Sequence, residues 1–292
     1  MIRHYHTGFT LIELLVVIVL IGILAVGAGM LISRPIESYN DQLRRQQLVD
    51  SAEMALRKIA TDIRRALPNS VRVVDNGPTG WALEMVNTVD GARYRDEAGG
   101  IFNTANDVLD FASVDTDFNV LGRFSTLATG PLDPSYRAVI YNTSPAGIYS
   151  DASANNNPGI ISPPGLTLSL NNGEHHLAMS SPFQFSFQSP GQRVFLVDGP
   201  VSYVCDSATA SLTRFDGYAY QLNHADIDSL GELSALASVN EGRVASQVSG
   251  CAIDYQPGSS QRGGLITLEL TISDAENESI RLLHQVHVDN VP

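Results

Sequence analysis

The sequence has few basic residues for its acidic content. Its 292 residues include 18 Lys and Arg against 31 Asp and Glu, a formal net charge of −13. The imbalance lies in residues 69–292, where ten Arg oppose 25 Asp and Glu, a net charge of −15. Nucleic-acid binding needs cationic surface that displaces counterions from phosphates, so we predict no nucleic-acid partner. The simplest role for the acidic charge is to keep the protein soluble.

Motifs typical of enzymes are also missing. The chain has no G-x-S-x-G, H-E-x-x-H or P-loop motif. Ser, His and Asp are plentiful, but none falls in a recognisable catalytic arrangement. We therefore predict that the protein is not an enzyme, with no catalytic residue and no cofactor.

Histidine ligands for a metal ion are poorly placed. His284 and His287 are three residues apart, and on a strand such residues point to opposite faces. His175 and His176 adjoin an Asn-Gly turn and lack partners. These patterns predict no zinc site.

A calcium loop is only half present. Asp115–Asn119 reads D-x-D-x-N, which is how such loops begin. Val120 then occupies the position of the required glycine, and Thr126 that of the bidentate glutamate. We predict that no metal binds here.

One long uncharged run stands at the N-terminus. Leu14–Ile32 contains 19 residues without a charge, and a helix of this length spans about 28 Å, the thickness of a bilayer core. A secretory signal would have a shorter apolar core followed by an A-x-A-like site, and no clean site of this kind follows. The run predicts a membrane-spanning helix that the mature protein keeps.

The residues before this run carry a specific motif. A short leader with one Arg ends in Gly8, and GFTLIE (Gly8–Glu13) opens the apolar stretch. This segment resembles the processing signature of type IV pilins and pseudopilins. The resemblance implies that a prepilin peptidase cleaves between Gly8 and Phe9, and that the new N-terminal Phe9 is methylated.

Glu13 is a carboxylate at the end of an apolar helix, which costs several kcal/mol if it is unpaired and usually marks function. The resemblance places it as the fifth residue of the mature chain. There it implies that Glu13 neutralises the N-terminal amine of a neighbouring subunit during assembly. The alternative is a glutamate at the level of the lipid headgroups, satisfied by water.

A helical pattern continues beyond the membrane run. Apolar residues recur at steps of three and four, which is one face of an amphipathic helix that we expect to pack on a sheet: Leu48, Ala52, Ala55, Leu56, Ile59, Ile63, Ala66 and Leu67. Pro68-Asn69 ends the pattern. Pro35 interrupts it and should kink the helix, because proline removes a backbone donor and clashes with the preceding turn.

From residue 69 the texture becomes β-type. Short apolar runs alternate with Gly, Pro, Asn and Asp. We predict an α+β fold of the type IV pilin kind, in which a long N-terminal helix packs on an antiparallel β-sheet head. The segments are a leader (1–8), a transmembrane or filament-core helix (9–33), an amphipathic helix (34–68) and the head (69–292).

The strands expected in the head are Ser70–Val74, Trp81–Val86, Val108–Ala112, Ala138–Tyr141, Phe183–Phe187, Arg193–Asp198, Val201–Cys205, Ser211–Phe215, Gly217–Gln221, Val248–Tyr255, Leu265–Ile272 and Ile280–Val288. Asp198-Gly199-Pro200 is expected to be a tight turn. Tyr149–Gly165 is polar and rich in Asn and Pro, and is expected to be a surface loop.

The chain has only two cysteines, Cys205 and Cys251. A sparse, even pair in an exported protein suggests one disulfide. The bond would close a loop of about 46 residues, which stabilises by roughly 4 kcal/mol in the chain-entropy model. Two buried thiols are the alternative.

Three further passages resemble a narrower group, the MshO-type minor pilins of the mannose-sensitive haemagglutinin (MSHA) pilus. They are Ala55–Val73, Arg193–Ala219 and Leu282–Val291. The resemblance implies a minor pilin that acts in assembly initiation or at the pilus tip. Its partners would be the prepilin peptidase, the major pilin, other minor pilins, the inner-membrane assembly platform and, before assembly, the lipid bilayer.

The implied location is the bacterial inner membrane, crossed once with the head in the periplasm, and later a pilus on the cell surface. One alternative is a J-like pseudopilin of type II secretion, which differs in its partners. Another is a tip adhesin that binds through residues 87–192, which match no family pattern. A third, a membrane-anchored enzyme, needs a site that the sequence does not show.

Overall fold

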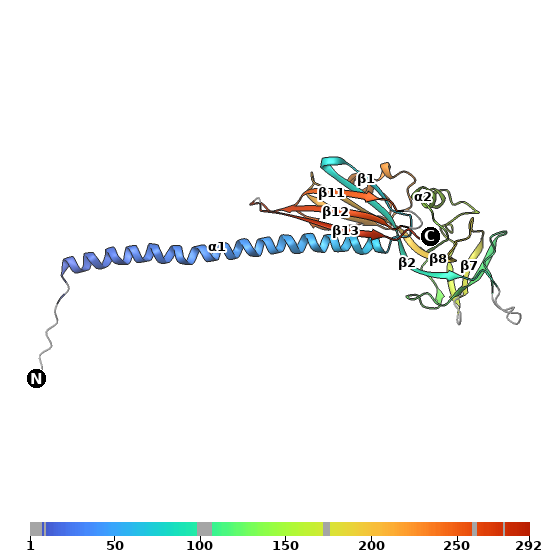
Figure 1. The fold of residues 1–292 in the computed structure, drawn as a ribbon, viewed down its shortest axis with the longest axis horizontal. Helices are drawn as coiled ribbons and strands as arrows, with labels where there is room; N and C mark the ends of the chain where they lie inside the picture. Colours follow the sequence, from blue (N-terminus) through green and yellow to red (C-terminus); the bar gives the residue numbers. More distant parts are fainter. Residues whose placement is uncertain (1–7, 9, 98–106, 172–175, 259–261, 277) are drawn as a thin grey trace, which may run out of the picture. The chain divides into compact units, whose positions relative to one another are not determined.

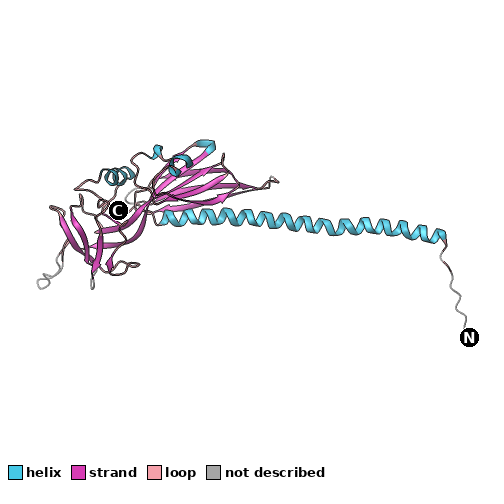
Figure 2. Cartoon of the chain, turned by 180° about the vertical axis from the view of Figure 1, so that it is seen from behind, coloured by secondary structure: helices cyan, strands magenta, loops and turns pink. Residues whose placement is uncertain are grey.

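The computed structural model describes residues 8, 10–97, 107–171, 176–258, 262–276 and 278–292. A long helix, α1 (Leu11–Arg64), precedes a head of antiparallel strands and short helices (Figures 1 and 2). The chain divides into two compact units, residues 1–50 and 51–292. The predicted α+β fold, an apolar N-terminal helix followed by an antiparallel head, is confirmed.

The strands of the head are β1 (Arg72–Asp75), β2 (Gly80–Tyr94), β3 (Asp115–Leu121), β4 (Gly130–Pro131), β5 (Arg137–Val139), β6 (Leu168–Asn171), β7 (His176–Phe183), β8 (Arg193–Asp206), β9 (Ser211–Asp216), β10 (Asn240–Ser246), β11 (Val248–Gln256), β12 (Gly264–Ser273) and β13 (Ser279–Val288). The short helices are η1 (Gly77–Thr79), α2 (Pro145–Ala154), η2 (His224–Asp226) and α3 (Leu230–Ser234).

Two sheets make up the head. The larger has the order β10-β9-β8-β2-β3-β7-β6-β4, with β1 paired to β2 and β5 paired to β8. The smaller is β11-β12-β13, which lies beside the head end of α1 in both views. In β12, residues alternate between buried and half-buried positions, as expected for a strand with one face on a core.

The head end of α1 buries its apolar stripe. All eight residues predicted to form that stripe, from Leu48 to Leu67, are buried. The helix ends at Arg64, ahead of Pro68, and the Leu67 amide donates instead to the carbonyl of Val86 in β2. The chain therefore passes from helix to sheet without leaving that amide unpaired.

Residues 87–192, which match no family pattern, contribute most of a second core. β3, β6 and β7 supply Phe118, Leu168 and Leu177, which pack with the far ends of the long strands β2 and β8. We call the described part of residues 87–192 the lobe. Because it has its own buried cluster, it is a folded part of the head rather than a set of long loops.

Several local predictions are wrong. Asp198-Gly199-Pro200 is not a turn: it lies within β8, where Gly199 pairs with Asn87 and Asp198 is the extra residue of a β-bulge. Proline and glycine are tolerated at bulges, so these two residues indicate a distortion within the strand and not its end.

The expected surface loop Tyr149–Gly165 is right only in part, since residues 153–158 are exposed but the segments on both sides of them are buried. Tyr149 lies in α2 and is fully buried, and Ile161 is buried in a bridge with Val139. Val108–Ala112 and Gly217–Gln221 are not strands, and the expected strand Phe183–Phe187 overlaps β7 only at Phe183. The strands β3, β4, β6 and β10 and most of β7 were missed. Whether these segments form strands depends on pairing with distant parts of the chain, and their composition alone does not show that pairing.

Candidate functional site: the N-terminal helix and what holds the head

The first turn of α1 is capped locally. The Glu13 amide donates to the Thr10 hydroxyl at 3.4 Å, and the Leu14 amide donates to the Thr10 carbonyl at 3.1 Å. An acidic residue in the first turn complements the positive end of the helix dipole. Glu13 therefore stabilises the start of α1, whether or not it also acts in assembly. Gly8 is exposed just ahead of the helix, and Phe9 lies outside the described residues.

The following stretch is a candidate membrane span. Leu11–Ala28 has a mean hydropathy of 3.0, and none of it is buried within the chain. Its large apolar side chains are 42–82% exposed. Burying apolar surface stabilises by roughly 25 cal/mol per Å², so this segment requires a covering that the described part of the chain does not provide. Lipid or other subunits are the two coverings that fit an apolar helix of this length with a single acidic residue near its start.

The helix α1 continues through Pro35. The expected kink at Pro35 stays a prediction.

A buried carboxylate fixes the head end of α1. Asp62 is 7% exposed, and its Oδ2 accepts hydrogen bonds from Tyr203 Oη in β8 at 2.7 Å and from Arg214 Nε in β9 at 2.8 Å. Lys58 Nζ lies 3.2 Å from the other oxygen. Burial alone would raise the pKa of Asp62, but the hydrogen bonds from Arg214 and Tyr203 outweigh it and hold the pKa below its usual value. The ionised carboxylate is therefore part of the folded head.

A second buried acidic residue, Glu84, lies in β2. It is fully buried, is paired with Arg72, and accepts a hydrogen bond from Tyr218 Oη at 2.9 Å. Arg72 also stacks over the ring of Tyr149, with 3.6 Å between its Cζ and the ring centroid. Burial raises the pKa of Glu84 and the Arg72 charge opposes that rise. Arg72 also donates to the backbone carbonyls of Gln221 and Leu222, so both charges have several partners, although the buried Tyr149 hydroxyl has no hydrogen-bond partner among the described residues.

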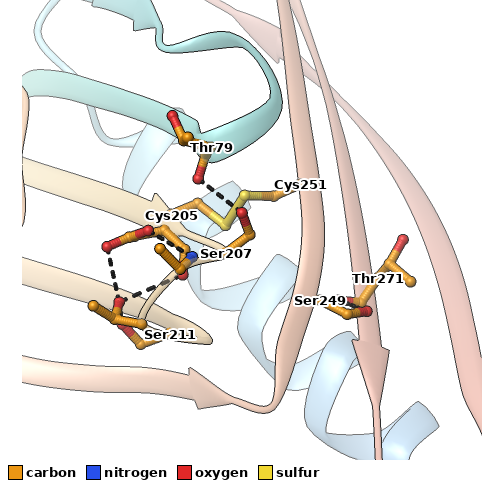
Figure 3. Close-up of a disulfide and its surroundings, with 10 residues drawn as sticks. Thr79, Cys205, Ser207, Ser211, Ser249, Cys251 and Thr271 are labelled. Atoms are coloured by element: carbon orange, nitrogen blue, oxygen red, sulfur yellow. Dashed lines mark hydrogen bonds between the residues drawn. A yellow bond between two sulfur atoms is a disulfide. The ribbon is translucent and has the colours of Figure 1, made fainter. Parts of the chain in front are cut away.

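The two cysteines form a disulfide between the two sheets. Cys205 in β8 and Cys251 in β11 have their Cα atoms 6.6 Å apart (Figure 3). Beside it, Gly80 has φ +144°, and a Cβ there would lie 1.8 Å from the Cys205 carbonyl oxygen, so only glycine permits this approach. The bond covalently ties the large sheet to the small one that lies beside α1.

Two of the segments considered as metal ligands have a different structure from the one expected. Asp115–Asn119 is not a loop but part of β3. His176 has partners: its Nε2 lies 3.3 Å from Asp107 Oδ2 and 3.7 Å from Asp117 Oδ2. The reading of His176 as partnerless is therefore wrong, while His175 lies outside the described residues. Burial and the nearby charge of Asp117 raise the pKa of Asp107, although the hydrogen bond with His176 opposes this.

His284 and His287 do lie on one strand, β13, with His284 half-buried and His287 exposed. The two imidazoles therefore occupy opposite faces and do not share a ligand position.

Residues 3–29 match the family model described as the prokaryotic N-terminal methylation motif. No curated protein and no solved structure matches the chain. The match covers Gly8, Phe9 and Glu13 and the whole of the exposed apolar span Leu11–Ala28. The chain therefore has a type IV prepilin-like N-terminal methylation motif, and its exposed apolar helix and antiparallel head are consistent with a membrane-anchored pilin-like protein.

Proposed function

We propose that the protein is a minor pilin, a structural subunit of an MSHA-like type IV pilus that acts in assembly initiation or at the tip. The observation that carries this proposal is the combination of a prepilin motif with an apolar helical segment, Leu11–Ala28, in which no residue is buried. A soluble protein rarely leaves an 18-residue segment with a mean hydropathy of 3.0 uncovered.

Processing is the first step of the proposed mechanism. A prepilin peptidase cuts between Gly8 and Phe9, and Phe9 is then methylated on its new amine. Because cleavage precedes α1, the whole helix stays in the mature subunit.

Assembly follows from the chemistry of Glu13. Lipid tails are as apolar as a neighbouring helix, so the hydrophobic effect alone does not drive this helix from bilayer to filament. A carboxylate close to hydrocarbon is costly unless paired, and an amine on the next subunit supplies the partner. Charge pairing and helix packing then favour the filament core, with the acidic head outside.

The proposed partners follow from these steps: the major pilin, other minor pilins and the inner-membrane assembly platform. The protein is expected first in the bacterial inner membrane with its head in the periplasm, and then in the surface pilus. A 292-residue chain is large for a subunit that must repeat along a shaft, which supports a minor role.

The decisive experiment is Glu13→Ala, with Glu53→Ala as the matched control. Glu53 is an exposed glutamate of the same helix, paired with Arg57 one turn on. We expect Glu13→Ala to insert and be processed normally but to be missing from sheared pili, while Glu53→Ala assembles. Unchanged assembly of a normally inserted and processed Glu13→Ala subunit would refute the charge-pairing mechanism.

The second core around β3, β6 and β7 favours one additional candidate, a tip adhesin. A lobe with its own core can carry a binding surface that the filament itself does not need. Loss of adhesion in lobe variants that still enter pili would support it. Co-purification with sheared pili, in a low ratio to the major subunit, separates both proposals from a J-like type II secretion pseudopilin.

A further inference from the structure

The outer face of the lobe brings two chelating side chains together across a strand pair. In the β3–β7 ladder Asn119 pairs with His176 and Asp117 with Ala178, so Asp117 and His176 are diagonal neighbours on one face. Phe118 and its partner Leu177 point the other way, into the core. Two ladder positions therefore fix both side chains relative to each other.

A third ligand comes from the segment that runs beside β3. The Asp107 amide donates to Asn119 Oδ1 at 3.1 Å, and the Asn119 amide donates to the Asp107 carbonyl at 3.0 Å. This two-point contact holds the Asp107 main chain against the strand, because Asn119 is itself buried. The Asp107 carboxylate then reaches His176 from outside the ladder.

The distances allow an ion between the three side chains, in addition to the hydrogen bond that joins His176 to Asp107. His176 Nε2 lies 3.3 Å from Asp107 Oδ2 and 3.7 Å from Asp117 Oδ2, and the donor atoms of all three side chains lie within 4.8 Å of one another. The longer distance exceeds a hydrogen bond. An ion bound by nitrogen and carboxylate oxygen at about 2.0–2.2 Å places neighbouring donors roughly 3.0–3.5 Å apart in tetrahedral or octahedral geometry, close to what is present.

We propose that Asp107, Asp117 and His176 bind a divalent transition-metal ion such as Zn²⁺. An imidazole combined with carboxylates suits these ions, whereas Ca²⁺ prefers oxygen ligands throughout. The three side chains are 26–43% exposed, so an ion can enter from solvent. Three protein ligands leave a coordination position open for water or for a donor from another molecule.

The test uses the full chain in detergent, purified without a polyhistidine tag and stripped with a chelator. Titration calorimetry with ZnCl₂ is expected to show one ion per chain, and CaCl₂ is expected not to compete. Asp117→Asn and His176→Gln should each weaken Zn²⁺ binding by at least about tenfold.

The matched controls are Asp254→Asn and His287→Gln, which change an exposed aspartate and an exposed histidine on the small sheet. Both should bind Zn²⁺ like the wild type. Wild-type protein without saturable Zn²⁺ binding would overturn the proposal whatever the variants do. So would His176→Gln protein that binds as tightly as the wild type. Bound Co²⁺ gives an independent measurement, since its visible absorption should be present in the wild type and lost in His176→Gln.

Discussion

The two ends of α1 contain the same kinds of apolar residue in opposite surroundings. Ile18 is 61% exposed and Ile59 is fully buried, and Leu24 is 70% exposed whereas Leu56 is 4% exposed. Helix propensity and hydrophobicity cannot explain this contrast, because the residue types are identical. What differs is the partner: the last turns bury one face within the head, and within the described residues nothing covers the first turns.

The comparison implies that the two ends are separable. Changes near Gly8 and Glu13 should alter maturation and assembly and leave the folding of the head unchanged. Changes around Asp62 should alter the free energy of unfolding of the head. The following predictions test that division, beginning with the largest effect.

Gly8→Val should abolish maturation. The signature requires glycine on the leader side of the cut, and a branched side chain at this position should block the peptidase. We expect only full-length precursor on a gel of membrane fractions, with the leader still present by mass spectrometry. Gly22→Val, within the exposed span where a Cβ meets nothing within 4 Å, should mature normally. Normal processing of Gly8→Val would show that the cleavage site lies elsewhere.

Loss of the disulfide should destabilise the head by roughly 4 kcal/mol, because the unfolded chain regains the freedom of a loop of about 46 residues. The double variant Cys205→Ser/Cys251→Ser should show this in urea unfolding, whereas the exposed helix end should still support membrane insertion. A reductant should destabilise the wild type and leave the double variant unchanged. Equal urea midpoints for the two oxidised proteins would contradict the assignment of a stabilising bridge.

Asp62→Asn should cost about 2–3 kcal/mol, since Arg214 loses its buried anionic partner. Asp50→Asn, at an exposed position of the same helix, is the control and should be nearly neutral. Urea unfolding at neutral pH measures both variants. An Asp62→Asn protein as stable as the control would show that the carboxylate does not hold α1 to β8 and β9.

The same variant gives a pH test with a definite sign. The folded-state pKa of Asp62 lies below the unfolded value of 3.8, so its ionised form favours the folded state. This contribution is complete above the unfolded pKa and is lost as the pH falls through the folded one. The difference in unfolding free energy between wild type and Asp62→Asn should therefore shrink below about pH 4. A difference that stayed constant there would contradict the assigned charge state.

Sequence reasoning found the elements whose signal is local. The motif at Gly8–Glu13 was recognised, the apolar stripe of α1 was identified by its spacing, and β11, β12 and β13 were predicted within two residues. Alternation over nine or ten residues specifies such strands without outside help.

The rest depends on residues far apart in the chain. Asp62 looks like an ordinary helix-surface acid four residues after Lys58, yet its buried partners are 141 and 152 residues away. The grouping of Asp117 with His176 likewise exists only once β3 pairs with β7. A single sequence does not show such pairings. The buried contacts of Asp62 and the proposed metal ligands were therefore missed for the same reason.

The smallest predicted effect concerns Lys58, which lies at the edge of the buried anchor. Its Nζ is 3.2 Å from Asp62 Oδ1, but its side chain is 49% exposed, so water screens the pair. Lys58→Gln should cost less than about 1 kcal/mol, and added salt should reduce the cost further. A double-mutant cycle with Asp62→Asn measures the coupling directly. A coupling as large as the full effect of Asp62→Asn would mean that Asp62 stabilises the protein through this pair within α1, and not through its contacts with Tyr203 and Arg214 of the head. The buried contacts of Asp62 would then no longer explain why the head end of α1 differs from the exposed end.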